Sequence, residues 1–220
     1  IRNMPNKPAS RGDKPARRRR KEDRPAELTA AALDLFVEKG YAATRLEDVA
    51  AQAGVSKGTL YLYFDSKAAL FKAVVRAGLL PALAECERLV AGYAGRSDDL
   101  LREVVGGMWR QIGSQRIGGI PKLVIAEARN FPEIARFYHE EVILRGTAMI
   151  RAVIAHGIAR GEFRPLDPDV AIHIVIAPGL MRMIMRHSID CCAIACIDDA
   201  SYFAEYFEIM LRGLRATPSG

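Results

Sequence analysis

Apolar residues recur at helical spacing along almost the whole chain from residue 26 onward. The first apolar stripe falls at i, i+4, i+7 and i+8 and consists of Leu28, Ala32, Leu35 and Phe36. It ends at Gly40, with Lys39 in the last turn, which is how helices commonly end. No convincing run of alternating β-branched residues interrupts the pattern, so the sequence predicts an all-α fold.

Two short helices separated by a tight turn follow the first helix. Thr44 followed by Glu47 predicts a capping box at the start of the first one. Its apolar stripe, stopped by Gly54, comprises Leu46, Val49, Ala50 and Ala53. Ser56 is expected mainly as the N-cap of the second helix, which runs to about residue 64. This arrangement is a helix-turn-helix, which presents the N-terminal residues of its second helix to the DNA major groove.

Caps and prolines divide the remainder of the chain into longer helices. We expect a kink or a helix end near Pro81, and Asp167 followed by Pro168 predicts a helix start. The expected helices cover residues 70 to about 81, 97–113, 121–130, 132–161, 168–187 and 199–214.

The segment from Gly40 to Lys67 carries a motif that points to a family. It reads GYAATRLEDVAAQAGVSKGTLYLYFDSK and closely resembles the DNA-binding segment of TetR-family (TetR/AcrR-type) transcriptional regulators, with a match over roughly residues 24–72. Arg45 and Tyr63 depart from the residues usual in that family. The resemblance implies an N-terminal three-helix helix-turn-helix domain, a C-terminal helical ligand-binding and dimerisation domain, and about nine helices in all. We therefore expect a basic flexible arm over residues 1–23, the DNA-binding domain over 24–72 and the helical domain over 73–220.

The resemblance and the chemistry of the side chains together suggest a set of DNA-contacting residues. Its members are Thr44, Arg45, Ser56, Lys57, Gly58, Thr59, Tyr61, Tyr63 and Lys67. Those expected at phosphates are Thr44, Arg45, Tyr63 and Lys67. Lys57 can donate to guanine O6 or N7, Thr59 can bond a base or pack on a thymine methyl group, and Gly58 permits close approach. Arg45 could instead reach a base edge, and Tyr61 could simply cover the hydrophobic seam.

Positive charge is concentrated at the N-terminus of the chain. Residues 1–24 hold ten Lys or Arg against three acidic residues, which gives +7, whereas the whole chain carries +6. A Pro-, Lys- and Arg-rich segment is typical of a solvated arm that binds nucleic acid, and a merely solubilising tail is the alternative. Residues 25–72 hold five basic and six acidic side chains, so we expect non-specific DNA affinity to depend on the arm.

Residues 168–187 are apolar nearly all round, which a small globular protein can use only if both faces of the helix are covered. One face is therefore expected to meet a second subunit. The family resemblance implies a homodimer formed through residues 168–187 and 199–214. Because two recognition helices would reach half-sites about 34 Å apart, or a multiple of one DNA turn, the double-stranded operator should be roughly palindromic.

Apolar and aromatic side chains of the helical domain are candidates for an effector pocket. They are Met108, Trp109, Ile112, Phe137, Tyr138, Met149, His173, Met181 and Met185. Flexible methionines and the polar tips of Trp109 and Tyr138 suit a small apolar or aromatic ligand, although the same residue types commonly form plain core. No pattern identifies the effector, and none calls for a cofactor.

A group of side chains near the C-terminus leaves a second kind of regulation open. His187, Cys191, Cys192 and Cys196 could bind a metal ion or act as a thiol switch. Their spacing is no standard zinc pattern, and cysteines packed as small hydrophobes are commoner, so no metal site is assigned. A redox- or metal-responsive regulator remains the alternative.

Composition weighs against several other protein classes. The longest nearly apolar run, residues 172–181, contains His173 and Pro178 and is shorter than the roughly 20 residues of a membrane-spanning helix. Four cysteines, two of them adjacent, suit a reducing compartment, so we expect a cytoplasmic protein without membrane association.

The chain lacks the sequence patterns of a catalytic site. No nucleophile–base pair, phosphate-binding glycine loop or His–Glu metal motif indicates an enzyme. The leading interpretation is a homodimeric transcriptional repressor that a ligand releases from its operator. An activator or architectural DNA binder without a ligand, and a helical enzyme, are the alternatives.

Overall fold

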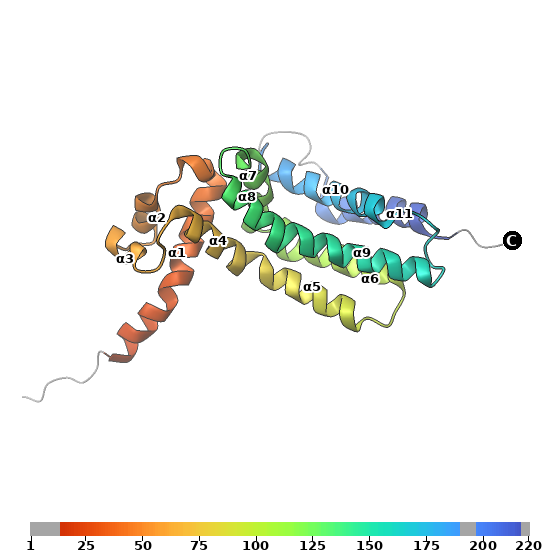
Figure 1. The fold of residues 1–220 in the computed structure, drawn as a ribbon, viewed down its shortest axis with the longest axis horizontal. Helices are drawn as coiled ribbons and strands as arrows, with labels where there is room; N and C mark the ends of the chain where they lie inside the picture. The colour runs from red at the N-terminus through yellow and green to blue at the C-terminus, as the bar shows by residue number, and fades with distance from the viewer. Residues whose placement is uncertain (1–13, 190–196, 217–220) are drawn as a thin grey trace, which may run out of the picture.

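The computed structural model describes the backbone of residues 14–189 and 197–216, with side chains from Asp23 onward, and Figure 1 shows that this part is helical throughout. Its α-helices are α1 (Lys14–Ala43), α2 (Leu46–Gln52), α3 (Lys57–Tyr61), α4 (Lys67–Gly78), α5 (Leu80–Gly92), α6 (Ser97–Met108), α7 (Ile120–Glu127), α8 (Pro132–Tyr138), α9 (Leu144–Ala159), α10 (Pro168–Arg186) and α11 (Asp199–Leu214). Among these residues no strand forms, and the only β-type pairing is an isolated bridge. The predicted all-α class is confirmed.

Several predicted helix boundaries are confirmed. A break at Leu79 separates α4 from α5, and Pro81 stands in the first turn of α5, where its missing N–H costs nothing. The Asp167 carboxylate accepts a hydrogen bond from the Asp169 N–H at 2.9 Å and so caps α10. Helices α8 and α9 form one continuous helix, because a π-helical turn over His139–Ile143 joins them.

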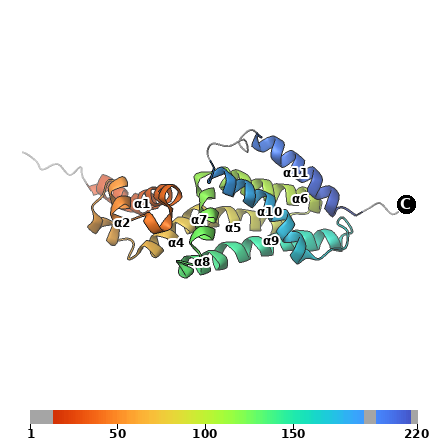
Figure 2. The same cartoon turned by 90° about the horizontal axis from the view of Figure 1, so that it is seen from above.

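The molecule divides into two regions along its length, which we call the head (α1–α4) and the body (α5–α11). Figures 1 and 2 show the head at one end and the long helices of the body extending toward the C-terminal end. One buried core fills the head and continues onto α7 and α8, whereas a second core lies among α5, α6, α9, α10 and α11. Burial of apolar side chains from helices distant in sequence therefore holds both regions together.

A cluster of aromatic rings lies at the centre of the head core. The rings of Phe36, Tyr41 and Phe71 have centroids 5.5–5.7 Å apart. Gly40, at φ +82°, lets α1 bend directly before Tyr41, a conformation that residues with a Cβ rarely adopt. The bend carries Tyr41 into the core and prepares the chain for the turn into α2.

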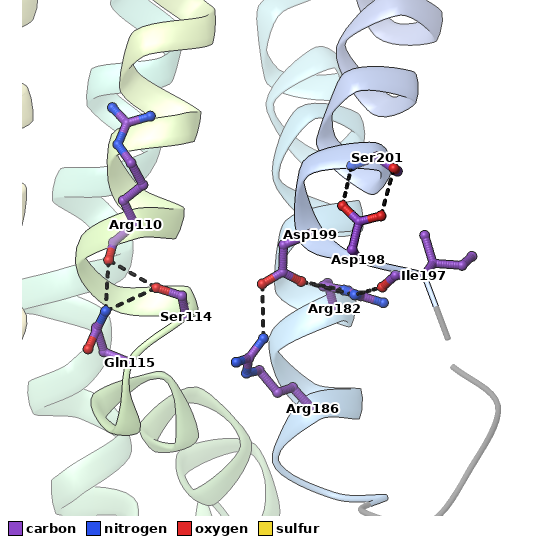
Figure 3. A network of polar contacts seen from close by, with 9 residues as sticks. All are labelled: Arg110, Ser114, Gln115, Arg182, Arg186, Ile197, Asp198, Asp199 and Ser201. Atoms are coloured by element: carbon purple, nitrogen blue, oxygen red, sulfur yellow. Dashed lines mark hydrogen bonds and ion pairs between the residues drawn. The ribbon is translucent and has the colours of Figure 1, made fainter. Parts of the chain in front are cut away.

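The last two helices of the body are joined by polar contacts near the C-terminal end of α10. Figure 3 shows Asp199, at the start of α11, between Arg182 and Arg186 of α10, with 2.9 Å from its carboxylate oxygens to each guanidinium. Farther along, the Tyr206 hydroxyl donates to the Val175 carbonyl at 2.6 Å. Helices α10 and α11 therefore form one firmly connected layer.

Two sequence expectations differ from the structure at the N-terminal side. Helix α1 begins at Lys14, so residues 14–23 of the segment expected as a flexible arm are helical. The capping box is wrong, because α2 begins at Leu46 with Arg45 as its N-cap and without a side-chain cap. The Thr44 hydroxyl instead donates back to the Gly40 and Leu35 carbonyls, at 2.7 and 3.2 Å.

The expectation that no segment is long and apolar enough to span a membrane is also wrong by length and composition. Two described helices meet that criterion, Pro132–Ala159 and Pro168–Arg186. Most of Pro168–Arg186 is not buried within the subunit, and its exposed apolar side chains, among them Val170, Ile174 and Met181, recur at helical spacing. The apolar composition of this helix therefore reflects an outward-facing apolar stripe.

Candidate nucleic-acid interface

A tight turn fixes the angle between α2 and α3. Gly54 adopts φ +66°, and the Val55 N–H donates to the Ala50 carbonyl at 2.9 Å. Ala50 and Leu60 are buried on the two sides of this turn. Since Gly54 has no Cβ, it takes the left-handed conformation without strain, and the turn closes as the sequence predicted.

Helix α3 is capped by its own N-terminal residues. The Ser56 hydroxyl oxygen accepts a hydrogen bond from the Thr59 N–H at 3.1 Å and lies 2.9 Å from the Thr59 hydroxyl. Ser56 is thus the N-cap that the sequence predicted. Only five residues long, α3 depends on this cap and on the buried Leu60 to keep its conformation.

The outer face of α3 carries polar and aromatic groups in contact with solvent. Lys57, Gly58 and Tyr61 are exposed, Tyr61 by 43%, and the Lys57 ammonium lies 5.8 Å from the Tyr61 ring centre. The Lys57 Nζ is 2.5 Å from a carboxylate oxygen of Glu47, and this hydrogen bond raises the pKa of Lys57. Lys57 is therefore cationic, and the exposed carboxylate of Glu47 holds it against α2.

Leu62 is an exposed residue of this face that sequence reasoning missed. It follows α3 directly and is 82% exposed. Its neighbours Leu60 and Phe64 are buried, so helical phase alone places Leu62 on the opposite side. An apolar side chain there is suited to packing on a thymine methyl group.

The residues expected at phosphates fall into two groups. Arg45 is exposed at the start of α2, and Tyr63 is half-buried against the head core. Thr44, by contrast, is only 1% exposed, and its hydroxyl is occupied by the carbonyls of α1. The Thr44 side chain therefore bonds the backbone of α1 and does not face solvent.

Lys67 closes the C-terminal turn of α1. Its ammonium donates to the carbonyls of Tyr41, Ala42 and Thr44 at 2.7, 3.0 and 3.0 Å and lies 4.6 Å from the Tyr41 ring centre. Burial lowers the pKa of Lys67, with the Glu127 charge acting in the opposite direction. All three ammonium donors satisfy carbonyls that the end of α1 leaves without helical partners, so Lys67 sets where α2 starts.

The same turn is one of the places where the head meets the body. The Ala42 N–H donates to the Glu127 carboxylate of α7 at 3.1 Å, and the Tyr41 and Phe131 ring centres are 4.7 Å apart. Burial, together with the carboxylates of Glu133 and Glu127, raises the pKa of Tyr41 to about 12. These contacts connect α7 and the residue before α8 directly to the end of α1.

The candidate effector residues do not converge on one site. Ile112, Phe137 and Tyr138 belong to the head core, whereas Trp109 and Met149 belong to the body core. Met108 contacts both cores, Met185 is half-buried, and His173 and Met181 are exposed on α10. The buried members are thus divided between two separate cores.

A shallow pocket of about 370 Å³ opens between α5 and α9. It is lined by Glu87, Val90, Ala91, Leu144, Arg145, Ala148 and Met149. Arg145 donates to both Glu87 carboxylate oxygens, at 2.8 and 2.7 Å, which lowers the pKa of Glu87. Met149 is the candidate effector residue that reaches this pocket.

Of the four residues suggested as a metal or redox site, only His187 lies within the described residues. Cys191, Cys192 and Cys196 lie outside the described residues. His187 is half-buried at the end of α10, where its carbonyl accepts a hydrogen bond from Lys122 at 2.5 Å. Within residues 14–189 and 197–216, no three His, Cys, Asp or Glu side chains are grouped to hold a metal ion.

Comparison with known proteins gives one consistent result. A family model described as bacterial regulatory proteins, tetR family, matches residues 28–74, and one described as tetracyclin repressor-like, C-terminal domain, matches residues 94–191. The transcriptional regulator RutR of Escherichia coli is 25% identical over 206 residues, covering 86% of this chain and 89% of RutR.

Solved structures share the fold over most of their length. The ketosteroid transcriptional regulator KstR2 of Mycobacterium tuberculosis superposes with a TM-score of 0.69 at 24% identity, covering 88% of this chain and 96% of KstR2. FadR of Bacillus subtilis in complex with stearoyl-CoA superposes with a TM-score of 0.64 at 17% identity, covering 86% of this chain and 98% of FadR.

Proposed function

Because the chain belongs to the TetR family of DNA-binding transcriptional regulators, we propose that it is a homodimeric repressor whose α3 helices read a palindromic operator. Members of this family bind DNA and small-molecule effectors and typically dimerise. The observation that carries the proposal is the outer face of α3, a rigidly capped helix that presents Lys57, Gly58 and Tyr61 to solvent at the end of the molecule.

Each residue of this face has a distinct role in the proposed complex. Lys57 leaves Glu47 and donates to a guanine edge, Gly58 allows the backbone to approach the bases, and Thr59 contacts a base through its methyl group or hydroxyl. Arg45 and Tyr63 contact phosphates on either side. Thr44 and Lys67, whose polar groups are bonded to backbone carbonyls, act by holding the turn that positions these contacts.

The dimer is proposed to form through α10 and α11. Their exposed apolar side chains include Val170, Ile174 and Met181 of α10 and Ile209 of α11, with Ile174 exposed by 63%. Apolar side chains exposed in this way are costly in water and are stabilised when a second copy covers them. The two-fold axis of such a dimer would relate the two α3 helices and so impose a palindromic site.

Release from DNA is proposed to follow binding of a small apolar or aromatic ligand in the body. FadR of Bacillus subtilis, which shares the fold, forms a complex with stearoyl-CoA, and this likeness of fold supports an apolar ligand. Of the two conformations, the ligand must bind the one that does not fit DNA more tightly than the one that does. The coupling free energy for such a difference is typically about 1–3 kcal/mol. The contacts of Ala42 with Glu127 of α7 and of Tyr41 with Phe131, directly before α8, provide a path to the head, beside the direct connection from α5 to α4. We place the protein in the cytoplasm.

Binding to DNA from upstream of its own gene tests the proposal. Fluorescence anisotropy with competitor DNA should give tight binding for the wild type and a loss of about 5- to 150-fold for Lys57→Ala and for Tyr61→Ala. Arg88→Ala, an exposed arginine of α5, is the matched control and should bind as the wild type does. Equal binding by all four proteins would contradict the role of α3.

A further inference from the structure

The C-terminal end of α10 rests on a pair of glycines that also contacts the head. Gly118 and Gly119 belong to the 3₁₀ helix η2 (Arg116–Gly119), directly before α7, and both are buried. A Cβ atom added to Gly118 would lie 3.2 Å from His187 Nε2, and one added to Gly119 would lie 3.4 Å from His187 Nδ1. The Gly119 Cβ would also be only 2.9 Å from both methyl carbons of Val37 in α1. The glycine backbone therefore occupies a narrow space between the His187 ring and α1, which we call the His187 seat.

Polar contacts hold the His187 seat from both sides. Arg116 of η2 bonds Asp34 of α1, with 2.6 Å from its Nε to the carboxylate oxygen, and also donates to the Asp34 carbonyl at 3.2 Å. Lys122 of α7 donates to the His187 carbonyl at the end of α10. A continuous set of contacts thus runs from α10, the helix proposed to form the dimer, through η2 to α1, which leads into the helix-turn-helix.

The His187 ring faces three positive charges in this seat. Among the described residues its Nε2 atom is buried and has no hydrogen-bond partner. The cations that act on the ring come from three elements, Arg116 of η2, Lys122 of α7 and Arg186 of α10. Arg116 is already bonded to α1, and Figure 3 shows Arg186 bonded to Asp199 at 2.9 Å. Burial and these cations lower the pKa of His187, so the ring is neutral at neutral pH.

We propose that His187 is a positioning residue for DNA binding: its neutral ring holds the head in a fixed orientation to α10, and its protonated ring leaves the seat and frees the head. The inference rests on the proposed function and adds a regulation to it, release from the operator in acid. A cationic ring is unfavourable in the seat, because the Nε2 proton has no acceptor among the described residues and three cations repel it. Once the ring leaves, the glycine pair is supported only from the side of α1.

The pH dependence of operator binding tests the inference. An imidazole with the ordinary pKa of 6.5 is about nine-tenths protonated at about pH 5.5, so holding it neutral on DNA costs about tenfold in affinity. We therefore expect the wild type to bind the operator about tenfold more weakly at pH 5.5 than at pH 7.5, whereas His187→Gln, which cannot be charged, keeps its affinity. His156→Gln, at an exposed histidine of α9, is the matched control and should lose affinity as the wild type does.

A scrambled duplex distinguishes this loss from the general effect of pH on DNA binding. A protein gains positive charge as pH falls, and its attraction to phosphates then increases. Binding to the scrambled duplex should therefore stay constant or rise in all three proteins. A loss that is confined to the operator has the opposite sign and points to the orientation of the heads.

A packing test that needs no titration accompanies the pH series. Gly119→Ala places a methyl group 2.9 Å from the Val37 methyl carbons and should push η2 away from α1, which weakens operator binding at pH 7.5 by about tenfold. Val37→Ala in the same chain removes those carbons and should restore most of the affinity. Gly92→Ala is the control, because an added Cβ there meets nothing within 4 Å, and it should bind as the wild type does.

Hydrogen exchange separates failure of this inference from failure of the proposed function, because it needs no DNA. After correction for the intrinsic pH dependence of exchange, amides of residues 34–43 and 116–127 should lose protection at pH 5.5 in the wild type but not in His187→Gln. Equal pH profiles of these two proteins, opening of the seat without a change in operator affinity, or no rescue of Gly119→Ala by Val37→Ala would overturn the inference. Wild-type protein that binds the operator and scrambled duplexes alike at pH 7.5 would instead contradict the proposed function, while hydrogen exchange still tests the seat.

Discussion

The head and the body expose different kinds of surface and stabilise them in different ways. In the head, polar side chains hold the backbone, with Lys67 bonded to three carbonyls and Ser56 capping α3, and the exposed face of α3 mixes polar and apolar groups. In the body, α10 and α11 are firmly joined to each other but leave an apolar stripe uncovered. The core of the head is thus closed within one subunit, whereas the body leaves the apolar face through which we propose that it dimerises.

The largest expected effect comes from charging the apolar stripe of the body. Ile174→Glu with Met181→Glu would place two carboxylates in the proposed dimer seam, where their desolvation is costly. We expect a monomer by sedimentation velocity and a loss of operator affinity of more than about 100-fold, because the two heads no longer bind as one unit. Helical circular dichroism should remain, since both side chains already lie in solvent in the subunit.

Ile125→Glu is the matched control for the dimer experiment. Ile125 is an exposed isoleucine of α7, outside the proposed seam. It should leave a dimer that binds DNA. A dimer in both proteins would show that α10 is not the interface, and the contrast between head and body would then fail.

The next effect concerns the polar support of the head. Lys67→Met removes the ammonium that satisfies the carbonyls of Tyr41, Ala42 and Thr44, and we expect the free energy of unfolding to fall by about 2–3 kcal/mol. Urea denaturation measures the change, with Lys39→Met, an exposed lysine of α1, as control. DNA binding should weaken as well, since the start of α2 loses its support. Unchanged stability in the Lys67 variant would mean that the turn is held by packing alone.

A smaller effect is expected at the contact between α2 and α3. Glu47→Gln removes the carboxylate bound to Lys57 and one negative charge from the DNA-facing side. Affinity for scrambled DNA should rise by about two- to fivefold, because Lys57 no longer has to leave the Glu47 carboxylate before it binds a phosphate. The preference for the operator over scrambled DNA should fall. Glu85→Gln on α5 is the control. A drop in affinity of the Glu47 variant would indicate that Glu47 positions Lys57 for reading.

The smallest effect is a pH dependence at the junction of α10 with the loop before α7. Burial, followed by the charges of Arg186, Lys122 and Arg116, lowers the pKa of His187 below its ordinary value of 6.5, against a raising contribution from the Gln115 backbone. The unfolded chain therefore takes up the proton first, and stability present above about pH 6.5 is lost as pH falls toward the folded pKa. Urea titrations at successive pH values should show a shallower decline for His187→Gln than for wild type. The variant His156→Gln, at an exposed histidine of α9, should keep the wild-type decline.

Sequence predicted those features that depend on neighbouring residues. The Ser56 cap, the turn at Gly54, the break before Pro81 and the Asp167 cap are each determined within a few residues. The capping box failed because Thr44 has two possible sets of partners, and its hydroxyl turns back to α1. Basic composition suggested disorder before residue 24, yet α1 begins at Lys14 and continues past Pro25.

Features that depend on contacts between distant residues could not be predicted in this way. Lys67 reaches the Tyr41 carbonyl across 26 positions, and Arg116 bonds Asp34 across 82. An apolar stripe predicts that a side chain is buried, but not which core it enters. Ile112 and Trp109, both candidates for an effector pocket, belong to separate cores.

Methylation interference on the operator tests the central claim most directly, since it asks which guanine N7 atoms the protein must reach. For the wild type we expect two symmetric clusters of interfering guanines, centred about 34 Å apart or a multiple of one turn. In Lys57→Ala, one guanine of each cluster should cease to interfere, while the remaining positions stay unchanged. An interference pattern that is identical in the two proteins, or a single cluster without symmetry, would contradict the account of α3 as the reading helix of a dimer.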